Sequence, residues 1–133
     1  MNISIIPSLV LVGLLAAAAV QAGTVDDLLA EYQSKGVGSF DASAGEVLWQ
    51  QRFPSSDGVE RACTSCHTSD LRQKGRHAVT GKTMEPLAPS VNAKRFSKRR
   101  QIEKWFKRNC KWTLGRECTA QEKGDLLSFL RKQ

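Results

Sequence analysis

The stretch Cys63-Thr64-Ser65-Cys66-His67 decides the fold. Two cysteines three positions apart, with a histidine directly after the second, form the attachment pattern of a c-type haem. Each thiol adds to one vinyl group of the porphyrin, and the next side chain is then held against the iron, for which a neutral imidazole is a good axial ligand. We therefore predict one covalent haem c on Cys63 and Cys66, with His67 as the proximal iron ligand.

Two other kinds of site use closely spaced cysteines. A zinc ribbon needs a second close pair, whereas Cys110 and Cys118 stand eight positions apart. A thioredoxin-type redox pair belongs to an alternating pattern of strands and helices, and no such pattern surrounds residues 63–67. Haem attachment is therefore the interpretation that the spacing favours.

The first 22 residues are predicted to form a signal peptide that is cleaved on export. They contain no charged side chain, and their apolar run from Leu9 to Val20 has the length of a signal-peptide core. Val20-Gln21-Ala22 matches a cleavage site, which would leave residues 23–133 as the mature chain. A retained membrane anchor is the alternative, but a spanning helix needs roughly 18 to 20 apolar residues. We expect a periplasmic protein without a membrane span.

Residues 23–133 are enough for one domain, with a modest core that a covalent haem would enlarge. The formal net charge of +7 suits an acidic protein partner or an anionic ligand. Nucleic acid is the other usual partner of a basic chain, but an exported protein seldom meets it. In an oxidising compartment, the remaining Cys110 and Cys118 are predicted to form a disulfide.

Capping residues and apolar periodicity predict an all-α fold with four helices. The expected spans are from Thr24 to before Gly36, about 43–52, about 97–108, and from Thr119 onward. Thr24 is expected to cap the first helix, and the pairs Ser43 with Glu46 and Thr119 with Glu122 have capping-box spacing. Residues 68–89 show little periodicity, so we expect a loop that wraps one side of the haem.

Two of these helices are expected to cross each other. Gly45 indicates that another helix approaches the second helix closely, and Trp49 offers a large packing surface on the same face. Leu126 and Phe129 lie in the apolar pattern of the last helix. We expect these two residues to cross near Gly45 and Trp49.

The third predicted helix combines an apolar stripe with a basic face. Ile102, Trp105 and Phe106 form the stripe, and Trp105 is expected in the core, packed against the haem. The opposite face is either solvated charge, a docking patch for a redox partner, or countercharge for the haem propionates. Its members are Lys98, Arg99, Lys104, Lys107 and Arg108.

The sixth iron ligand decides the function. An iron with two strong protein ligands carries electrons, whereas an iron with a weak or missing ligand binds small molecules. Residues 23–133 contain one other histidine, His77, and one methionine, Met84. They follow His67 by ten and seventeen positions, yet either must reach the opposite haem face. The residues alone leave both open.

The chain resembles the sphaeroides haem protein family of small, exported, monohaem c-type cytochromes over nearly all of residues 23–133. The most specific shared feature is Arg108-Asn109-Cys110 with a second cysteine eight residues later. The other matching motifs are residues 63–67, Gly81-Lys82, Pro86-Leu87-Ala88-Pro89-Ser90, Arg95-Phe96, Glu103-Lys104-Trp105, Gly115-Arg116, Cys118-Thr119, Glu122-Lys123 and Asp125-Leu126-Leu127.

The resemblance implies a class I-like cytochrome fold of about four helices around one haem, with a short disulfide loop. It implies Asn109 as the distal ligand of a high-spin ferric iron. This asparagine leaves on reduction and opens a site for oxygen, nitric oxide or carbon monoxide. The resemblance also implies a dihaem cytochrome c as electron donor, and it leaves open whether the ligand is turned over.

Three alternatives to this interpretation remain at the level of the sequence. Met84 departs from the family pattern, and as the distal ligand it would make the protein an ordinary His/Met electron carrier. Asn109 would otherwise serve only as a cap at the C-terminal end of the third helix. A labile bridge between Cys110 and Cys118 would instead indicate a redox sensor.

Overall fold

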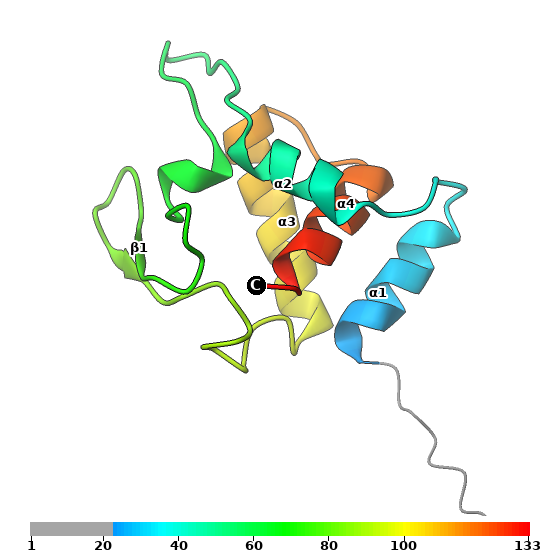
Figure 1. The fold of residues 1–133 in the computed structure, drawn as a ribbon. Coiled ribbons are helices and arrows are strands. Elements are labelled where there is room, and N and C mark those ends of the chain that lie inside the picture. Colours follow the sequence, from blue (N-terminus) through cyan, green and yellow to red (C-terminus); the bar gives the residue numbers. More distant parts are fainter. Residues whose placement is uncertain (1–22) are drawn as a thin grey trace, which may run out of the picture.

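The computed structural model describes residues 23–133, so the predicted signal peptide lies outside the described residues. Its helices are α1 (Thr24–Gln33), α2 (Ala42–Gln50), α3 (Arg99–Leu114) and α4 (Ala120–Leu130), with a 3₁₀ turn, η1 (Cys63–Ser65), and a short antiparallel hairpin of β1 (Gly75–Arg76) and β2 (Thr83–Met84) (Figure 1). The predicted four-helix fold is confirmed. Within residues 23–133, no helix is long and apolar enough to span a membrane.

Of the three predicted helix caps, one is confirmed, whereas the Ser43–Glu46 capping box and the Thr24 cap are wrong. In α4 the Thr119 hydroxyl accepts from the backbone N–H of Glu122, and the Glu122 carboxylate accepts from that of Thr119 at 2.8 Å, as predicted. In α2 the cap is Asp41, whose carboxylate accepts from the N–H of Ser43. The Thr24 hydroxyl donates to the distant carbonyl of Ser97, so Thr24 does not cap α1.

The close crossing of α2 and α4 is the packing centre of the fold (Figure 1). A Cβ atom added at Gly45 would overlap the backbone carbonyl of Asp125, so only glycine allows this approach. The rings of Trp49 and Phe129 pack with centroids 6.3 Å apart. Both observations confirm the predicted crossing.

Helix α3 is longer than predicted, and it ends at Leu114 before Gly115, which adopts a left-handed conformation with φ 73°. Asn109 therefore lies inside the helix, and its interpretation as a C-terminal cap is wrong. The buried stripe of α3 is Ile102, Phe106, Cys110 and Thr113. Trp105 lies off this stripe and is 40% exposed, so its expected place in the protein core is also wrong.

Helix α1 is held to α3 and α4 by a fully buried tyrosine. The hydroxyl of Tyr32 donates to the carboxylate of Glu103 on α3 at 2.5 Å. The ammonium of Lys123 on α4 donates to the other oxygen of this carboxylate at 2.9 Å. This hydrogen-bond network joins three helices that are distant in sequence.

The segment between α2 and α3 folds around the cysteine motif. The N–H of Arg76 donates to the carbonyl of Cys66 at 2.8 Å, which fastens the hairpin to the motif. The N–H groups of Leu87 and Ala88 both donate to the carbonyl of Leu71. The predicted loop of residues 68–89 is therefore an ordered segment that includes the short β1–β2 hairpin.

Candidate functional site

The five motif residues form one tight turn. The N–H of His67 donates to the carbonyl of Cys63 at 3.1 Å, and the Ser65 hydroxyl accepts from the N–H of Ala62 at 3.0 Å. In a helical turn, side chains three and four positions apart lie on the same side. Cys63, Cys66 and His67 therefore face the same region, and both cysteines have free thiols.

The electrostatics of this turn do not suit a reactive thiol pair. Burial raises the pKa of the Cys63 thiol to about 12, whereas a redox-active cysteine needs an accessible thiolate. Among the described residues, no group of three or more His, Cys, Asp or Glu side chains is arranged to hold a metal ion. Both rival interpretations of the motif thus lack support in the geometry.

His67 is positioned as a neutral imidazole. Burial, aided by the positive charge of Arg95, lowers the pKa of His67 to about 4, so the ring is uncharged at neutral pH. Only the neutral ring can bind a metal through nitrogen. It packs against Trp49 of α2 with ring centroids 5.4 Å apart.

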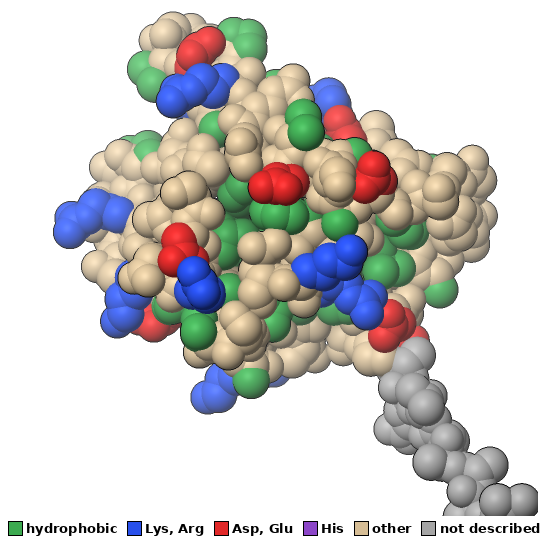
Figure 2. Space-filling model, viewed as in Figure 1, with side chains coloured by type: hydrophobic (Ala, Val, Ile, Leu, Met, Phe, Trp, Pro, Cys, Tyr) green, Lys and Arg blue, Asp and Glu red, His purple; other side chains and the backbone are tan. Residues whose placement is uncertain are grey.

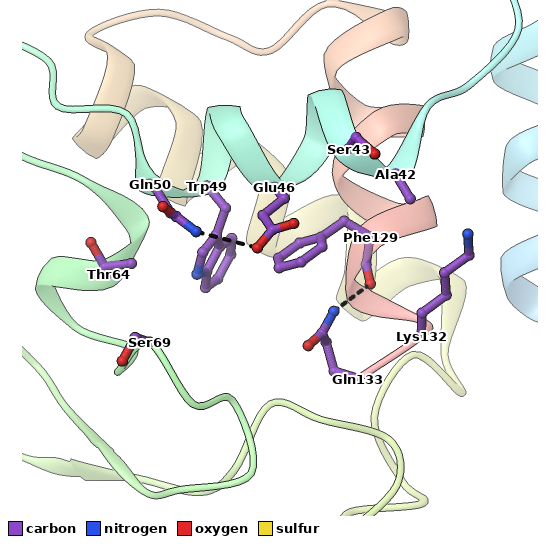
Figure 3. A pocket seen from close by; sticks show the side chains of 10 residues that line it. All are labelled: Ala42, Ser43, Glu46, Trp49, Gln50, Thr64, Ser69, Phe129, Lys132 and Gln133. Atoms are coloured by element: carbon purple, nitrogen blue, oxygen red, sulfur yellow. Dashed lines mark hydrogen bonds between the residues drawn. The ribbon is translucent and has the colours of Figure 1, made fainter.

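A pocket of about 280 Å³ opens beside the motif (Figure 3). Trp49 and Phe129 form its apolar wall, and Thr64 and Ser69 approach it from the motif and the residues after it. The remaining lining residues are Ala42, Ser43, Glu46, Gln50, Lys132 and Gln133. In the space-filling view, apolar side chains gather in the centre of the molecule with charged side chains around them (Figure 2). An exposed apolar surface of this kind is typical of a ligand site.

These residues fit a haem. Two free thiols and a neutral imidazole share one turn next to apolar surface. The indole N–H of Trp49 is buried and has no hydrogen-bond partner among the described residues. A haem carries two carboxylates, which are acceptors of the kind that this N–H lacks.

Asn109 lies on α3, directly before Cys110, and it is exposed. Cys110 is bonded to Cys118 with the Cα atoms 5.6 Å apart, which confirms the predicted disulfide. Trp105 and Trp112 follow the same side of the helix as Asn109, since they are four positions before it and three after it. The guanidinium of Arg61 lies over the Trp112 ring, 4.6 Å from its centroid, so this side faces the chain that leads into the motif.

Met84 and His77 lie elsewhere, in the hairpin beside Cys66. Met84 pairs with Gly75, whose backbone is close to the carbonyl of Cys66. The Nδ1 atom of His77 accepts from the N–H groups of Val79 and Thr80 at 3.3 and 3.2 Å. Both side chains therefore belong to the segment that is fastened to the motif.

The neighbours of His67 could not be identified from the sequence. Trp49 is predicted there only as a packing residue, and nothing in the composition marks Arg95 as close to His67. The one signal for Arg95 is its place, with Phe96, among the motifs that match the haem protein family.

The fold and this site define the class as monohaem c-type cytochromes. Residues 35–130 match the family model described as a domain of unknown function, DUF1924. The chain is 38% identical over 106 residues to the cytochrome c-type protein SHP of Cereibacter sphaeroides, aligned over 80% of this chain and 81% of that protein. It is also 38% identical over 86 residues to cytochrome c'' of Methylophilus methylotrophus, over 65% of this chain and 60% of that protein.

Solved structures agree with these relatives. The crystal structure of oxidised cytochrome c'' from Methylophilus methylotrophus matches with a TM-score of 0.74 and 30% identity, over 83% of this chain and 94% of that one. The structure of oxidised SHP, described as an oxygen-binding cytochrome c, matches with a TM-score of 0.72 and 36% identity, over 84% and 98%. The chain is a homologue of SHP, as the sequence motifs predicted. It belongs to the DUF1924 family and is also a homologue of cytochrome c''.

Proposed function

We propose that this protein is an exported cytochrome whose oxidised iron is held by His67 and Asn109, and whose Asn109 leaves on reduction so that a diatomic gas can bind. Cys63 and Cys66 provide the two thioether attachments. When bound, the haem supplies an iron that exchanges one electron and has an axial position open to oxygen, nitric oxide or carbon monoxide. The protein supplies the ligands and the apolar surroundings.

The observation that carries this proposal is the position of Asn109. Its amide is exposed on the side of α3 that turns toward the motif-bearing chain, and the neighbouring Cys110 is buried and disulfide-bonded. A rigid helix and a crosslink together restrict where the amide can lie. An amide is a weak, neutral donor, which ferric iron tolerates better than ferrous iron does. Loss of this ligand on reduction follows from that difference.

The relatives agree with a distal ligand that leaves. The SHP structure is described as that of an oxygen-binding cytochrome c. The solution structure of cytochrome c'' is described as giving insight into haem-ligand detachment, and it matches this chain with a TM-score of 0.71 and 30% identity. Both properties require an axial position that the protein can vacate.

The position of Met84 suits a distal ligand less well than the position of Asn109, which disfavours the competing function of a simple His/Met electron carrier. Its strand is paired to Gly75, and Gly75 lies against the carbonyl of Cys66, so Met84 is tied to the segment that also holds His67. A distal ligand must instead approach the opposite haem face. Asn109 comes from a separate element, α3, which supports its approach from that face.

The flank of α3 also offers a surface for the porphyrin. Trp105 is 40% exposed although it is a large aromatic residue four positions before Asn109. A porphyrin bound beside Asn109 would cover this ring, and burial of an aromatic side chain contributes about 2 kcal/mol or more. We therefore retain Trp105 as a haem-packing residue.

The experiment is spectroscopic. Optical and electron-spin-resonance spectra of the purified protein should show a ferric form that Asn109→Ala changes and that Met84→Ala leaves alone. Gln101→Ala is the matched control, because it removes an exposed amide from the same helix. The ferrous protein should bind carbon monoxide and nitric oxide. A ferrous form indifferent to both gases, or a ferric spectrum that depends on Met84, would overturn the proposal.

We also propose that a dihaem cytochrome c, or another acidic redox protein, docks on the basic face of α3. Arg99 of this face is paired with Glu31, whereas Lys98, Lys104, Lys107 and Arg108 are exposed and form no ion pair among the described residues. The rate of reduction by the donor should fall as ionic strength rises, and Lys104→Gln with Lys107→Gln should lower it. Lys82→Gln with Lys94→Gln is the control of equal charge, because both lysines are exposed and form no ion pair among the described residues. Equal rates for both pairs would exclude this face.

A further inference from the structure

The guanidinium of Arg95 is a half-buried positive charge that forms no ion pair among the described residues. Its Nε donates to the carbonyl of Pro86 at 2.8 Å and its Nη2 donates to that of Glu85 at 2.6 Å. Among residues 23–133, no carboxylate forms an ion pair with it. The nearby Glu85 carboxylate raises the pKa of Arg95, but burial lowers that pKa more, and this carboxylate pairs with Lys74 at 3.2 Å. A charge taken partly out of water without a counter-charge is unfavourable. The guanidinium therefore has no anion in direct contact among the described residues.

Arg95 lies on the same side of the molecule as His67, the proposed proximal ligand. The segment that carries the two carbonyls is fastened through Leu87 and Ala88 to the carbonyl of Leu71, four residues after His67. The side-chain amide of Asn92 also donates to the carbonyl of Pro86 at 3.1 Å. Leu71 and Ala88 belong to the same buried core as Trp49, whose ring packs against that of His67 with centroids 5.4 Å apart.

The backbone beside Arg95 adopts a strained conformation. Phe96 has a φ of 57°, and it is the one non-glycine residue with positive φ in the part of the chain that the structure describes. Bulky residues rarely adopt this conformation, which costs about 1–2 kcal/mol. Phe96 packs against the hydrophobic core, so this packing holds the turn in place. Together with the two carbonyl acceptors, the turn fixes where the guanidinium points.

We propose that Arg95 binds a propionate of the haem. A guanidinium has five N–H donors, and the two hydrogen bonds to carbonyls leave three for a carboxylate. A propionate supplies the missing negative charge, and guanidinium–carboxylate pairing is geometrically favourable. This inference rests on the proposed haem, and it adds a role that neither the thioethers nor the axial ligands fill.

One consequence concerns the reduction potential. Reduction adds one negative charge to the iron, and a fixed positive charge nearby favours the state with the extra electron. Because Arg95 is partly buried, solvent screens its charge less than that of an exposed arginine. Arg95 should therefore make the iron easier to reduce. It should thus favour the reduced state, in which Asn109 is no longer bound.

The test uses the purified holoprotein and three variants. Arg95→Gln removes the charge, Arg95→Lys keeps it, and Arg76→Gln is the control, because Arg76 is exposed and donates to a carbonyl in the hairpin near Cys66 without an ion pair. At a fixed applied potential, Arg95→Gln should raise the ferric-to-ferrous ratio about tenfold, which is 59 mV for one electron. It should also shift the propionate-bending band of the resonance Raman spectrum. Arg95→Lys should keep most of the potential, and Arg76→Gln should change neither quantity.

Two results would overturn the inference. If Arg95→Gln and Arg76→Gln give the same potential and the same propionate band, Arg95 does not contact the haem. If the potential changes while the band stays in place in both Arg95 variants, the charge acts at a distance and the propionate assignment is wrong. Should Arg95→Gln not fold, the band in Arg95→Lys decides alone. A wild-type preparation without haem would instead overturn the proposed function.

Discussion

Helix α3 has one side that packs within the protein and one side that is exposed. One side, with Ile102, Phe106 and Cys110, is buried within the protein. The adjacent side carries Trp105 and Asn109, which are exposed. The first side holds the fold together through protein contacts, whereas the second matches a surface that a porphyrin would cover. One helix therefore carries both packing residues of the domain and the proposed distal ligand, and the two roles can be tested separately.

The largest effect is expected at the attachment motif. Cys63→Ser with Cys66→Ser should abolish covalent haem, because serine forms no thioether, while the disulfide and the inner side of α3 remain. Haem staining after denaturing electrophoresis should fall to background. Thr64→Ala, which changes the motif but keeps both thiols, should stain like the wild type. Staining of the double variant would contradict the assignment of the two thiols.

A large loss of stability is expected at the helix crossing. Gly45→Ala places a methyl group against the backbone carbonyl of Asp125, which cannot move without shifting α4. Overpacking of this kind should lower the free energy of unfolding by about 3 kcal/mol. Denaturant titration measures the loss. Gly124→Ala meets the ring of Phe40, a side chain that can rotate, so its loss should be smaller. The reverse order would show that α4 adapts more easily than Phe40.

The disulfide links the inner side of α3 to the start of α4. Its removal by Cys110→Ser with Cys118→Ser should lower the free energy of unfolding by about 2.5 kcal/mol, the value that the chain-entropy model gives for a loop of this length. The same variant should broaden the ferric spectrum, because Asn109 is the adjacent residue. Unfolding with and without reductant provides the check. A wild-type protein whose stability does not respond to reductant would argue against this role.

The smallest effect concerns pH. Burial raises the pKa of Glu103, but the hydrogen bonds from Tyr32 and Lys123 lower it more, so its folded pKa lies below the ordinary 4.5. The resulting stability is present above pH 4.5 and is lost as the pH falls through the folded pKa. Glu103→Gln should therefore cost about 1 kcal/mol at neutral pH and progressively less in acid.

Thermal unfolding of Glu103→Gln at several pH values tests this expectation. Glu117→Gln is the control, since Glu117 forms an exposed pair with Lys111 and should contribute little. A difference in stability between wild type and Glu103→Gln that does not change with pH would contradict a role for the Glu103 charge. The side chain would then contribute through packing alone.

The sequence by itself determined the features that depend on neighbouring residues. The spacing of Cys63, Cys66 and His67 places three groups on one turn, and Thr119 with Glu122 closes a cap within four residues. The pairing of Cys110 with Cys118 also followed, because no other cysteines remained. Such features need no knowledge of distant contacts.

Tertiary structure alone decided the features that arise between distant segments. Helix α3 continues past Arg108 to Leu114, and its buried stripe is set by contacts with other helices, which leaves Trp105 outside the core. The Thr24 hydroxyl donates to the carbonyl of Ser97, 73 residues away. The guanidinium of Arg95 donates to the carbonyls of Glu85 and Pro86. Hydrogen bonds and burial between such segments depend on how the whole chain packs, and no local pattern encodes them.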